Sequence, residues 1–348
     1  MIVKRCLILN INNNNKENNM NTFKKIGLTA LAGSLVATSV FAGEMTVTGS
    51  AGINLANQDK TTKGNGFTMT DEITFAGSGE MDNGFTVAVS MQLDNNAVAS
   101  GGYMDNRSVT IGMGDMGTVT FSGHGGDSAF GAVDDVMPTA YGEAWDVLGT
   151  TTTGGVNLET AVAKKGSIAG TGANDNMLSF NNSSLVDGLS VTASYAPSDG
   201  TIVESVVSYA VAYTGVEGLT VGYAVDDNGL AGTTNIEIDT MYAKYAYGPV
   251  TVGYQKSTQE ATSTTNDDEF TSMGVTYAVS DSLSIGYHTS EFDDDNNTSD
   301  EESTSINFSY TMGSMTLAGA HVTVDNQGAS SAAINDVTGY VLDLSFAF

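Results

Sequence analysis

The side chains most able to do chemistry are carboxylates, and several fall within one long stretch, residues 124–174. This stretch carries Asp127, Asp134, Asp135, Glu143 and Asp146. Carboxylates that line an aqueous path attract cations and raise their local concentration. Basic side chains are scarce beyond the first 42 residues, where Arg107 is the one arginine and Lys244 is the clearest lysine within an expected strand. These residue types favour electrostatic selection of cations.

Catalytic patterns are weak. The three histidines, His124, His288 and His321, lie far apart and show no metal-ligand spacing. We expect each to be a loop residue or one that lines the interior of the fold. A serine nucleophile beside His288 or His321 would have to be chosen freely from many serines. The sequence therefore predicts no catalytic residues and no enzymatic activity.

An acidic run from Asp293 to Glu302 resembles a calcium-binding loop only superficially. It lacks the glycine at the sixth position that an EF-hand turn requires, and no helical pattern flanks it. Two interpretations stay open: a solvated loop, or diffuse binding of divalent cations at an outer rim. Apart from such cations, we expect no metal site and no cofactor.

The composition narrows the fold class. The 348 residues include 40 acidic and 12 basic side chains, with a formal net charge of -28. Charged residues make up 15% of the chain, against about 25% in ordinary soluble domains. The negative charge excludes nucleic-acid binding through a basic patch. After residue 45 no apolar run reaches about 18 residues, which excludes a bundle of membrane-spanning helices and leaves a large all-β protein.

Residues 20–42 are typical of a secretory signal peptide. Two lysines open the segment, a short stretch rich in Ala, Leu and Gly follows, and a small-x-small cleavage site ends at Ala42. Residues 1–19 fit no part of a signal, so we interpret them as an upstream extension, with translation starting at Met20. Without both segments the chain would keep 7 basic and 39 acidic residues, a net charge of -32, and no cysteine. A chain without thiols suits passage through an oxidising periplasm.

From residue 44 onward, apolar and small polar residues alternate with the period of two that marks strands with different faces. In the last segment, one face carries Tyr340, Leu342, Leu344, Phe346 and Phe348. A soluble sandwich turns such an apolar face inward, whereas a membrane barrel turns it outward to lipid.

The connections distinguish these two folds. Seven short turns alternate strictly with eight longer polar stretches, and together they join sixteen strands. A sandwich has no reason to separate short from long connections, but an up-and-down outer-membrane barrel does. We therefore predict an all-β fold over residues 43–348, a 16-stranded antiparallel transmembrane β-barrel.

Three stretches resemble, in order and spacing, the general porins of Gram-negative bacteria, of the sixteen-stranded proteobacterial type. They are residues 45–52, the hairpin 108–121, and the strands between 175 and 191. The resemblance covers essentially all of the predicted barrel. It implies a homotrimer of water-filled channels, surrounded by outer-membrane lipid and lipopolysaccharide. It also implies that the terminal Phe348 is an assembly signal for the barrel-assembly machinery, and that a third external loop, here 124–174, folds inward as a constriction.

Porins of this kind set the acids of the inward loop against a cluster of arginines, and this chain lacks that cluster. Arg107 shares its face with Val109 and Ile111, which favours a place at the rim. We therefore expect the loop acids, with Arg107 and Lys244, to form a cation-preferring constriction.

The expected function is passive diffusion of small hydrophilic solutes and ions through the outer membrane of a Gram-negative bacterium, after signal-peptide export. The alternatives are a substrate-selective outer-membrane channel and a secreted or surface structural protein such as an adhesin.

Overall fold

The computed structural model describes residues 45–59, 66–94, 104–147, 167–168, 175–198, 205–228, 236–261, 267–329 and 336–348. The predicted upstream extension and signal peptide lie outside the described residues. Within the described ranges, no helix is long and apolar enough to cross a membrane.

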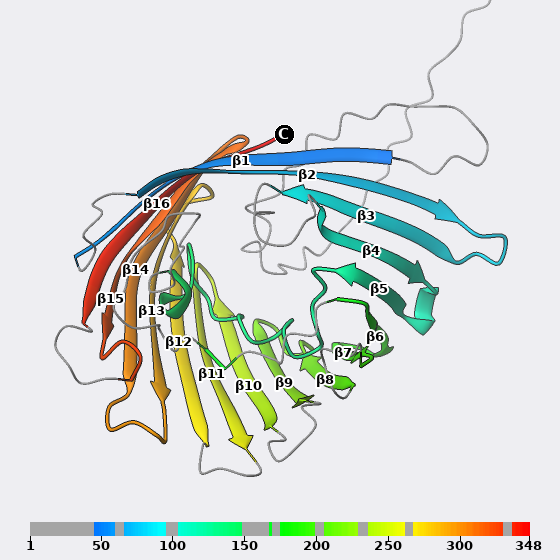
Figure 1. Ribbon diagram of the computed structural model, residues 1–348. Coiled ribbons are helices and arrows are strands. Elements are labelled where there is room, and N and C mark those ends of the chain that lie inside the picture. Colours follow the sequence, from blue (N-terminus) through cyan, green and yellow to red (C-terminus); the bar gives the residue numbers. More distant parts are fainter. Residues whose placement is uncertain are drawn as a thin grey trace, which may run out of the picture.

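Sixteen antiparallel strands close into one barrel, as predicted (Figure 1). Their bounds are β1 Met45–Gln58, β2 Gly66–Glu80, β3 Thr86–Asp94, β4 Met104–Gly112, β5 Thr118–His124, β6 Met177–Val186, β7 Leu189–Ala196, β8 Val206–Tyr213, β9 Leu219–Asn228, β10 Ile236–Tyr247, β11 Val250–Ala261, β12 Asp268–Ala278, β13 Leu283–Asp293, β14 Glu301–Met312, β15 Met315–Asp325 and β16 Val337–Ala347. Because β1 pairs with β16, the sheet has no free edge and every strand has two partners.

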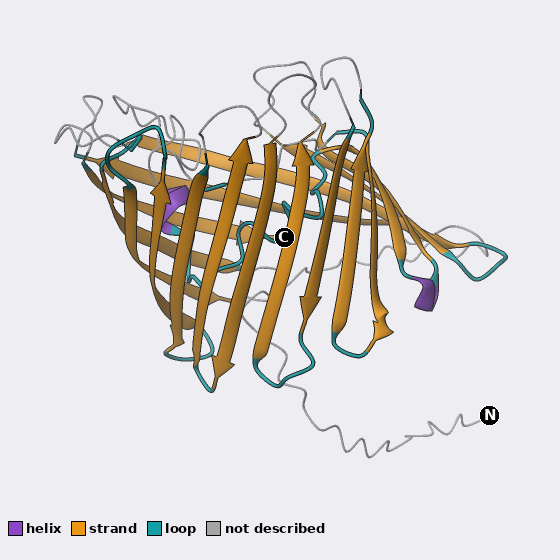
Figure 2. Cartoon of the chain, turned by 90° about the horizontal axis from the view of Figure 1, so that it is seen from below, coloured by secondary structure: helices purple, strands orange, loops and turns teal. Residues whose placement is uncertain are grey.

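Short turns join β2 to β3, β4 to β5 and each later even-numbered strand to the next, and these turns all lie at one end of the barrel (Figure 2). The β4–β5 turn contains the 3-10 helix η2, Gly114–Met116. Gly188 and Gly248 adopt φ values of 76° and 56° in two of the tightest turns. That left-handed region is readily open to glycine, which explains how turns of two residues fit there.

The two faces of the wall differ as the alternation predicts. Tyr209 and Ile306 are 56% and 66% exposed on the outer face, whereas their neighbours Ser208 and Ser305 are buried on the inner face. An apolar outer surface is what lipid contact requires, and small polar side chains on the inner face suit a wet lumen.

β15 departs from this pattern. Its inner face is apolar and buried, with Ala318, Ala320, Val322 and Val324, and His321 faces outward opposite the exposed Ile306 of β14. The expectation that His321 lines the interior or a loop is therefore wrong. The physical reason is that this inner surface packs against the chain that follows β5, so it contacts protein rather than water.

Two apolar clusters join the segment after β5 to the inner face of the barrel. The larger joins Phe130, Val133, Val136 and Met137 to buried wall residues of β8, β9, β10, β12 and β13. The smaller joins Val147 and Tyr141 to buried wall residues of β1, β15 and β16. Apolar burial thus attaches the segment after β5 to the inner wall.

Candidate pore constriction

Residues 125–147 run along the inner wall from β7 to β16 and end in the short helix α1, Ala144–Val147 (Figures 1 and 2). Their backbone is hydrogen bonded to lumen-facing side chains. The N–H of Ala129 donates to Ser194 Oγ on β7 at 2.9 Å, and that of Ala140 donates to Asn307 Oδ1 on β14 at 2.8 Å. Gln255 on β11 donates through Nε2 to the carbonyl oxygen of Asp134 at 2.8 Å.

The described part of the predicted constriction stretch therefore lies against the wall inside the barrel. Residues 148–166 and 169–174 of that stretch fall outside the described residues.

Three glycines on adjacent strands make room for this segment. A Cβ at Gly274 would lie 2.3 Å from the carbonyl oxygen of Pro138, and one at Gly253 would lie 2.5 Å from Pro138 Cδ. A Cβ at Gly286 would lie 3.1 Å from the backbone nitrogen of Ala140. We call Gly253, Gly274 and Gly286 the glycine track. A larger residue would collide with the Pro138 backbone at Gly274, with the Pro138 ring at Gly253 and with Asn307 at Gly286. The track therefore fixes how closely the segment approaches the wall.

Sequence reasoning missed the glycine track. The signal was present, because Gly253 and Gly286 each precede a tyrosine that is exposed on the outer face. A glycine next to an outward tyrosine in a strand faces the lumen. When such glycines recur on nearby strands, they indicate a place where another backbone approaches the wall.

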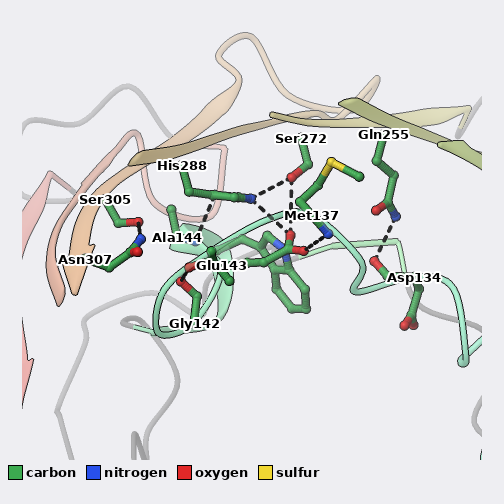
Figure 3. A network of polar contacts seen from close by, with 12 residues as sticks. Asp134, Met137, Gly142, Glu143, Ala144, Gln255, Ser272, His288, Ser305 and Asn307 are labelled. Atoms are coloured by element: carbon green, nitrogen blue, oxygen red, sulfur yellow. Dashed lines mark hydrogen bonds and ion pairs between the residues drawn. The ribbon is translucent and has the colours of Figure 1, made fainter. Parts of the chain in front are cut away.

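Glu143 is the centre of a buried polar network (Figure 3). Its Oε1 accepts the backbone N–H of Met137 at 2.6 Å, and its Oε2 accepts Nε1–H of Trp145 at 2.7 Å. The same Oε2 lies 3.1 Å from His288 Nε2 and 3.2 Å from Ser272 Oγ. The side chains of Glu143 and His288 are both 0% exposed. The network joins the segment to β12 and β13.

The tautomer of His288 follows from its contacts. The N–H of Ala144 donates to His288 Nδ1 at 3.0 Å, so the ring proton is on Nε2, which faces Glu143 and lies 2.8 Å from Ser272 Oγ. A serine–histidine nucleophile would instead need Nε2 free to accept the hydroxyl proton and a route for substrate. Ser272 is 1% exposed. This pair is a structural contact, and its geometry does not suit hydrolysis.

Burial raises the pKa of Glu143, but hydrogen bonds from His288, Asp135 and Trp145 outweigh this effect and hold the pKa below its ordinary value.

The pKa of Asp135 is shifted in the opposite direction. Its surface is open to the lumen, yet protein surrounds it on most sides. That low-dielectric surrounding, followed by the charge of Glu143 and then those of Asp146 and Asp134, raises the pKa of Asp135 to about 8. Asp135 is thus a protonated acid at neutral pH that donates to a charged Glu143.

This pair makes the current through the pore sensitive to alkaline pH. Because the pKa of Asp135 is raised in the packed segment, its protonated form stabilises that packing at low pH. This stabilisation is lost as the pH rises through about 8. Above that pH, Asp135 adds a negative charge beside Glu143, Asp134 and Asp146. Current noise in planar bilayers is expected to rise with a midpoint near pH 8. Asp135→Asn keeps a donor to Glu143 but does not ionise, so its noise should stay constant over this range. A wild-type midpoint that persists in Asp135→Asn would contradict the assignment.

The other predicted site residues occupy different places. Asp146 and Asp134 lie near Asp135, whereas Asp127 is exposed, its Oδ1 close to Gly131. Lys244 faces the lumen on β10, with Nζ 5.5 Å from the centre of the Tyr242 ring. Its Cγ would lie 3.2 Å from a Cβ at Gly253, which places it beside the glycine track.

Arg107 does not reach the loop acids. It pairs in register with the outward Met91 and donates from NH2 to the carbonyl oxygen of Gly123 at 3.4 Å. This position agrees with the place at the rim expected from the face that Arg107 shares with Val109, and its predicted membership of the constriction is wrong. Arg107 lies on the outer face of β3 and β4, so its side chain points away from the lumen.

Two further contacts lie at the loop end of the barrel. His124 Nδ1 is 2.6 Å from Asp175 Oδ1, which joins the end of β5 to the residues just before β6. In the acidic run, Asp294 is buried and accepts the backbone N–H of Asn296 at 2.9 Å, while Glu301 accepts that of Gly328 at 2.7 Å. These two carboxylates stabilise turns.

Phe348 closes the seam between the first and last strands. Its N–H donates to the carbonyl oxygen of Gly49 at 2.9 Å, and the N–H of Gly49 donates back at 2.8 Å. Its ring covers Gly49, where a Cβ would lie 2.7 Å from the ring edge.

Comparison with solved structures shows the same fold. The chain resembles an anion-selective porin from Comamonas acidovorans, with a TM-score of 0.64, 15% identity, and coverage of 88% of this chain and 100% of that chain. It also resembles the trimer form of OmpT, an outer membrane protein of Vibrio cholerae, with a TM-score of 0.62, 13% identity, and coverage of 88% and 100%. A triple mutant of Rhodopseudomonas blastica porin gives a TM-score of 0.61 and 16% identity, with coverage of 87% and 100%.

No curated protein matches the chain by sequence. The sequence model of the Gram-negative porin family matches residues 27–330, which is most of the chain. With the closed 16-stranded barrel, this match shows that the chain belongs to the Gram-negative porin family and is an outer-membrane channel.

Proposed function

We propose that this porin is a water-filled, cation-preferring channel for passive diffusion of small hydrophilic solutes. The observation that carries the proposal is the charge on the inner face. The carboxylates that the wall strands place there include Glu72, Asp94, Asp226, Asp268, Glu301 and Asp343. Among the basic residues that the structure describes, Lys244 faces the lumen, whereas Arg107 and Lys256 face outward. Fixed negative charge beside an aqueous path favours cations.

The fold alone does not decide the ion preference, because one structural relative is described as anion-selective. Selectivity follows from the charges that each chain places in its lumen. Apart from Asp135, which is protonated at neutral pH, the acids of residues 125–147 add to the negative inner face in this chain. We therefore assign to this segment both the narrowing of the path and part of the charge bias.

Lys244 offers a direct test of the charge argument. A charge 4–8 Å from an ion in water changes its free energy by about 0.5–1 kcal/mol, roughly a twofold to fivefold change in permeability ratio. Lys244→Gln should therefore raise the cation-to-anion permeability ratio, measured from zero-current potentials. Lys256→Gln is the matched control, because Lys256 lies on the outer face, paired with Glu269 at 2.7 Å. Equal shifts in both variants would argue against a lumen effect of Lys244.

Passive diffusion is tested by liposome swelling with neutral sugars of increasing size. The rate should fall smoothly with solute size and rise in proportion to the gradient. Saturable transport, or current block by one solute, would instead indicate a substrate-selective channel. A protein that is soluble without detergent and forms no channel would indicate a structural surface protein.

The assembly that we propose is a homotrimer in the outer membrane, exported by the signal peptide at residues 20–42 and in contact with lipopolysaccharide. Support comes from the trimer form of OmpT among the structural relatives. The broad apolar outer face also suits contact with lipid and with neighbouring subunits. Phe348 is assigned as the signal to the barrel-assembly machinery, and its place at the β1–β16 seam puts it where closure is completed.

A further inference from the structure

The seam between β1 and β16 holds two buried oxygen atoms that lack a donor. Asn54 and Asp343 are direct partners in the strand register, on the lumen side of the wall. Asn54 is 2% exposed. None of the described residues donates a hydrogen bond to Oδ1 of Asn54 or to Oδ1 of Asp343. An unpaired buried acceptor costs about 1–3 kcal/mol, and more when it is charged, so each atom calls for a hydrogen-bond donor or a cation.

Gly52 has no side chain between Thr70 and Asp343. A side chain at Gly52 would begin 2.6 Å from Thr70 Oγ1 and 3.4 Å from Asp343 Oδ1. Oxygen atoms from β2 and β16 therefore converge over the bare backbone of Gly52, two residues from Asn54 on the same face. The strands on either side of β1 thus bring a hydroxyl and a carboxylate oxygen together over Gly52, and Asn54 is the register partner of Asp343.

The protein's own described cations lie elsewhere. Arg107, Lys244 and Lys256 are on β4, β10 and β11, so no described lysine or arginine belongs to the strands at this seam. Tyr141 packs on the apolar cluster beside the seam. Burial, followed by the charge of Asp343, raises the pKa of Tyr141, so its phenol stays neutral and offers no charge to Asp343.

We propose that Asp343, Asn54 and Thr70 form a low-affinity site for a hard inorganic cation on the lumen wall. Oxygen ligands of these three kinds are those that such cations prefer. The described residues contain no group of three or more His, Cys, Asp and Glu side chains that would hold a metal ion, and this site instead combines one carboxylate with neutral oxygens. A single carboxylate gives weak binding, with a dissociation constant of about 10⁻³ M or above for Ca²⁺, because ligand charge count sets affinity.

Weak binding suits this position in a pore, because a permeating ion must be able to enter the site and leave it again. The inference rests on the proposed cation preference and gives it a specific place on the wall. It is tested by a binding measurement in detergent, which does not depend on channel activity.

The experiment uses Tb³⁺ as a probe for the Ca²⁺-type site, with luminescence sensitised by the nearby Tyr141. The folded wild-type protein should show a saturable component that Ca²⁺ displaces. Asp343→Asn should weaken that component by about tenfold, since charge count sets affinity in such sites. Tyr141→Phe should remove its sensitised emission. Heat-modifiable gel mobility confirms that each variant is folded.

Glu72→Gln is the matched control. Glu72 is another lumen-facing carboxylate, but its Oε2 already accepts Nε2–H of Gln92 at 2.6 Å. It should retain the saturable component. The proposal is overturned if Asp343→Asn binds like the wild type, or if Asp343→Asn and Glu72→Gln lose the signal equally, which would mean diffuse attraction by lumen charge. Site binding in a protein without cation-selective current would contradict the proposed function and leave this site standing.

Discussion

Replacing Glu143 with glutamine is expected to free residues 125–147 from the wall and to produce a noisy, protease-sensitive channel. The amide supplies one acceptor where the carboxylate serves the N–H of Met137, Nε1–H of Trp145 and the groups on β12 and β13. Its own NH₂ group would also face those donors. Unsatisfied buried groups of this kind cost on the order of 3 kcal/mol, roughly a hundredfold in the population of the detached segment.

Chymotrypsin measures this effect, because cleavage of a transiently opened segment follows the population of the open form when opening is fast. Fragments cut after Tyr141 or Trp145 should appear about a hundred times faster in Glu143→Gln than in the wild type. Asp127→Asn is the control, since Asp127 is an exposed acid on the same segment. Equal cleavage rates and equal current noise in all three proteins would show that the Glu143 network does not hold the segment.

Valine at Gly274 should detach the same segment without touching any charge. Its Cβ would lie 2.3 Å from the carbonyl oxygen of Pro138, and neither backbone can yield without breaking other contacts. Overpacking typically costs about 1–3 kcal/mol, so cleavage after Tyr141 should rise by roughly tenfold to a hundredfold. Valine suits a strand, so the barrel itself should form.

Gly79→Val is the matched substitution, because no atom lies within 4 Å of a Cβ at that strand position. It should leave cleavage and conductance unchanged. If Gly274→Val matched Gly79→Val in both measurements, the segment would not lie against the glycine track in the membrane.

The barrel could be predicted from the sequence because its determinants are local. Side chains in a strand alternate with a period of two, and turn residues such as Gly248 and Pro249 act within a few positions. Strand number, closure and the outward face of β16 followed from these patterns. β15 did not, because its inner face contacts protein, and the alternation alone does not show what covers a surface.

The sequence predicted which acidic residues belong to the candidate constriction, but not which residues they contact. The acids of 125–147 were found as a group, yet the partners of Glu143 were not, since His288 lies 145 positions away and shows no sequence spacing to it. The raised pKa of Asp135 depends on that same non-local packing. Two of the three glycines of the track precede outward tyrosines in the sequence, and this local pattern does not show which other part of the chain approaches them.

The zero-current potential in a KCl gradient tests the central claim of a cation-preferring channel most directly. Purified wild-type protein is inserted into a planar bilayer, with concentrated KCl on one side and dilute KCl on the other. Since K⁺ should cross more readily than Cl⁻, the dilute side is expected to become positive. A dilute side that becomes negative would show anion preference and contradict the account.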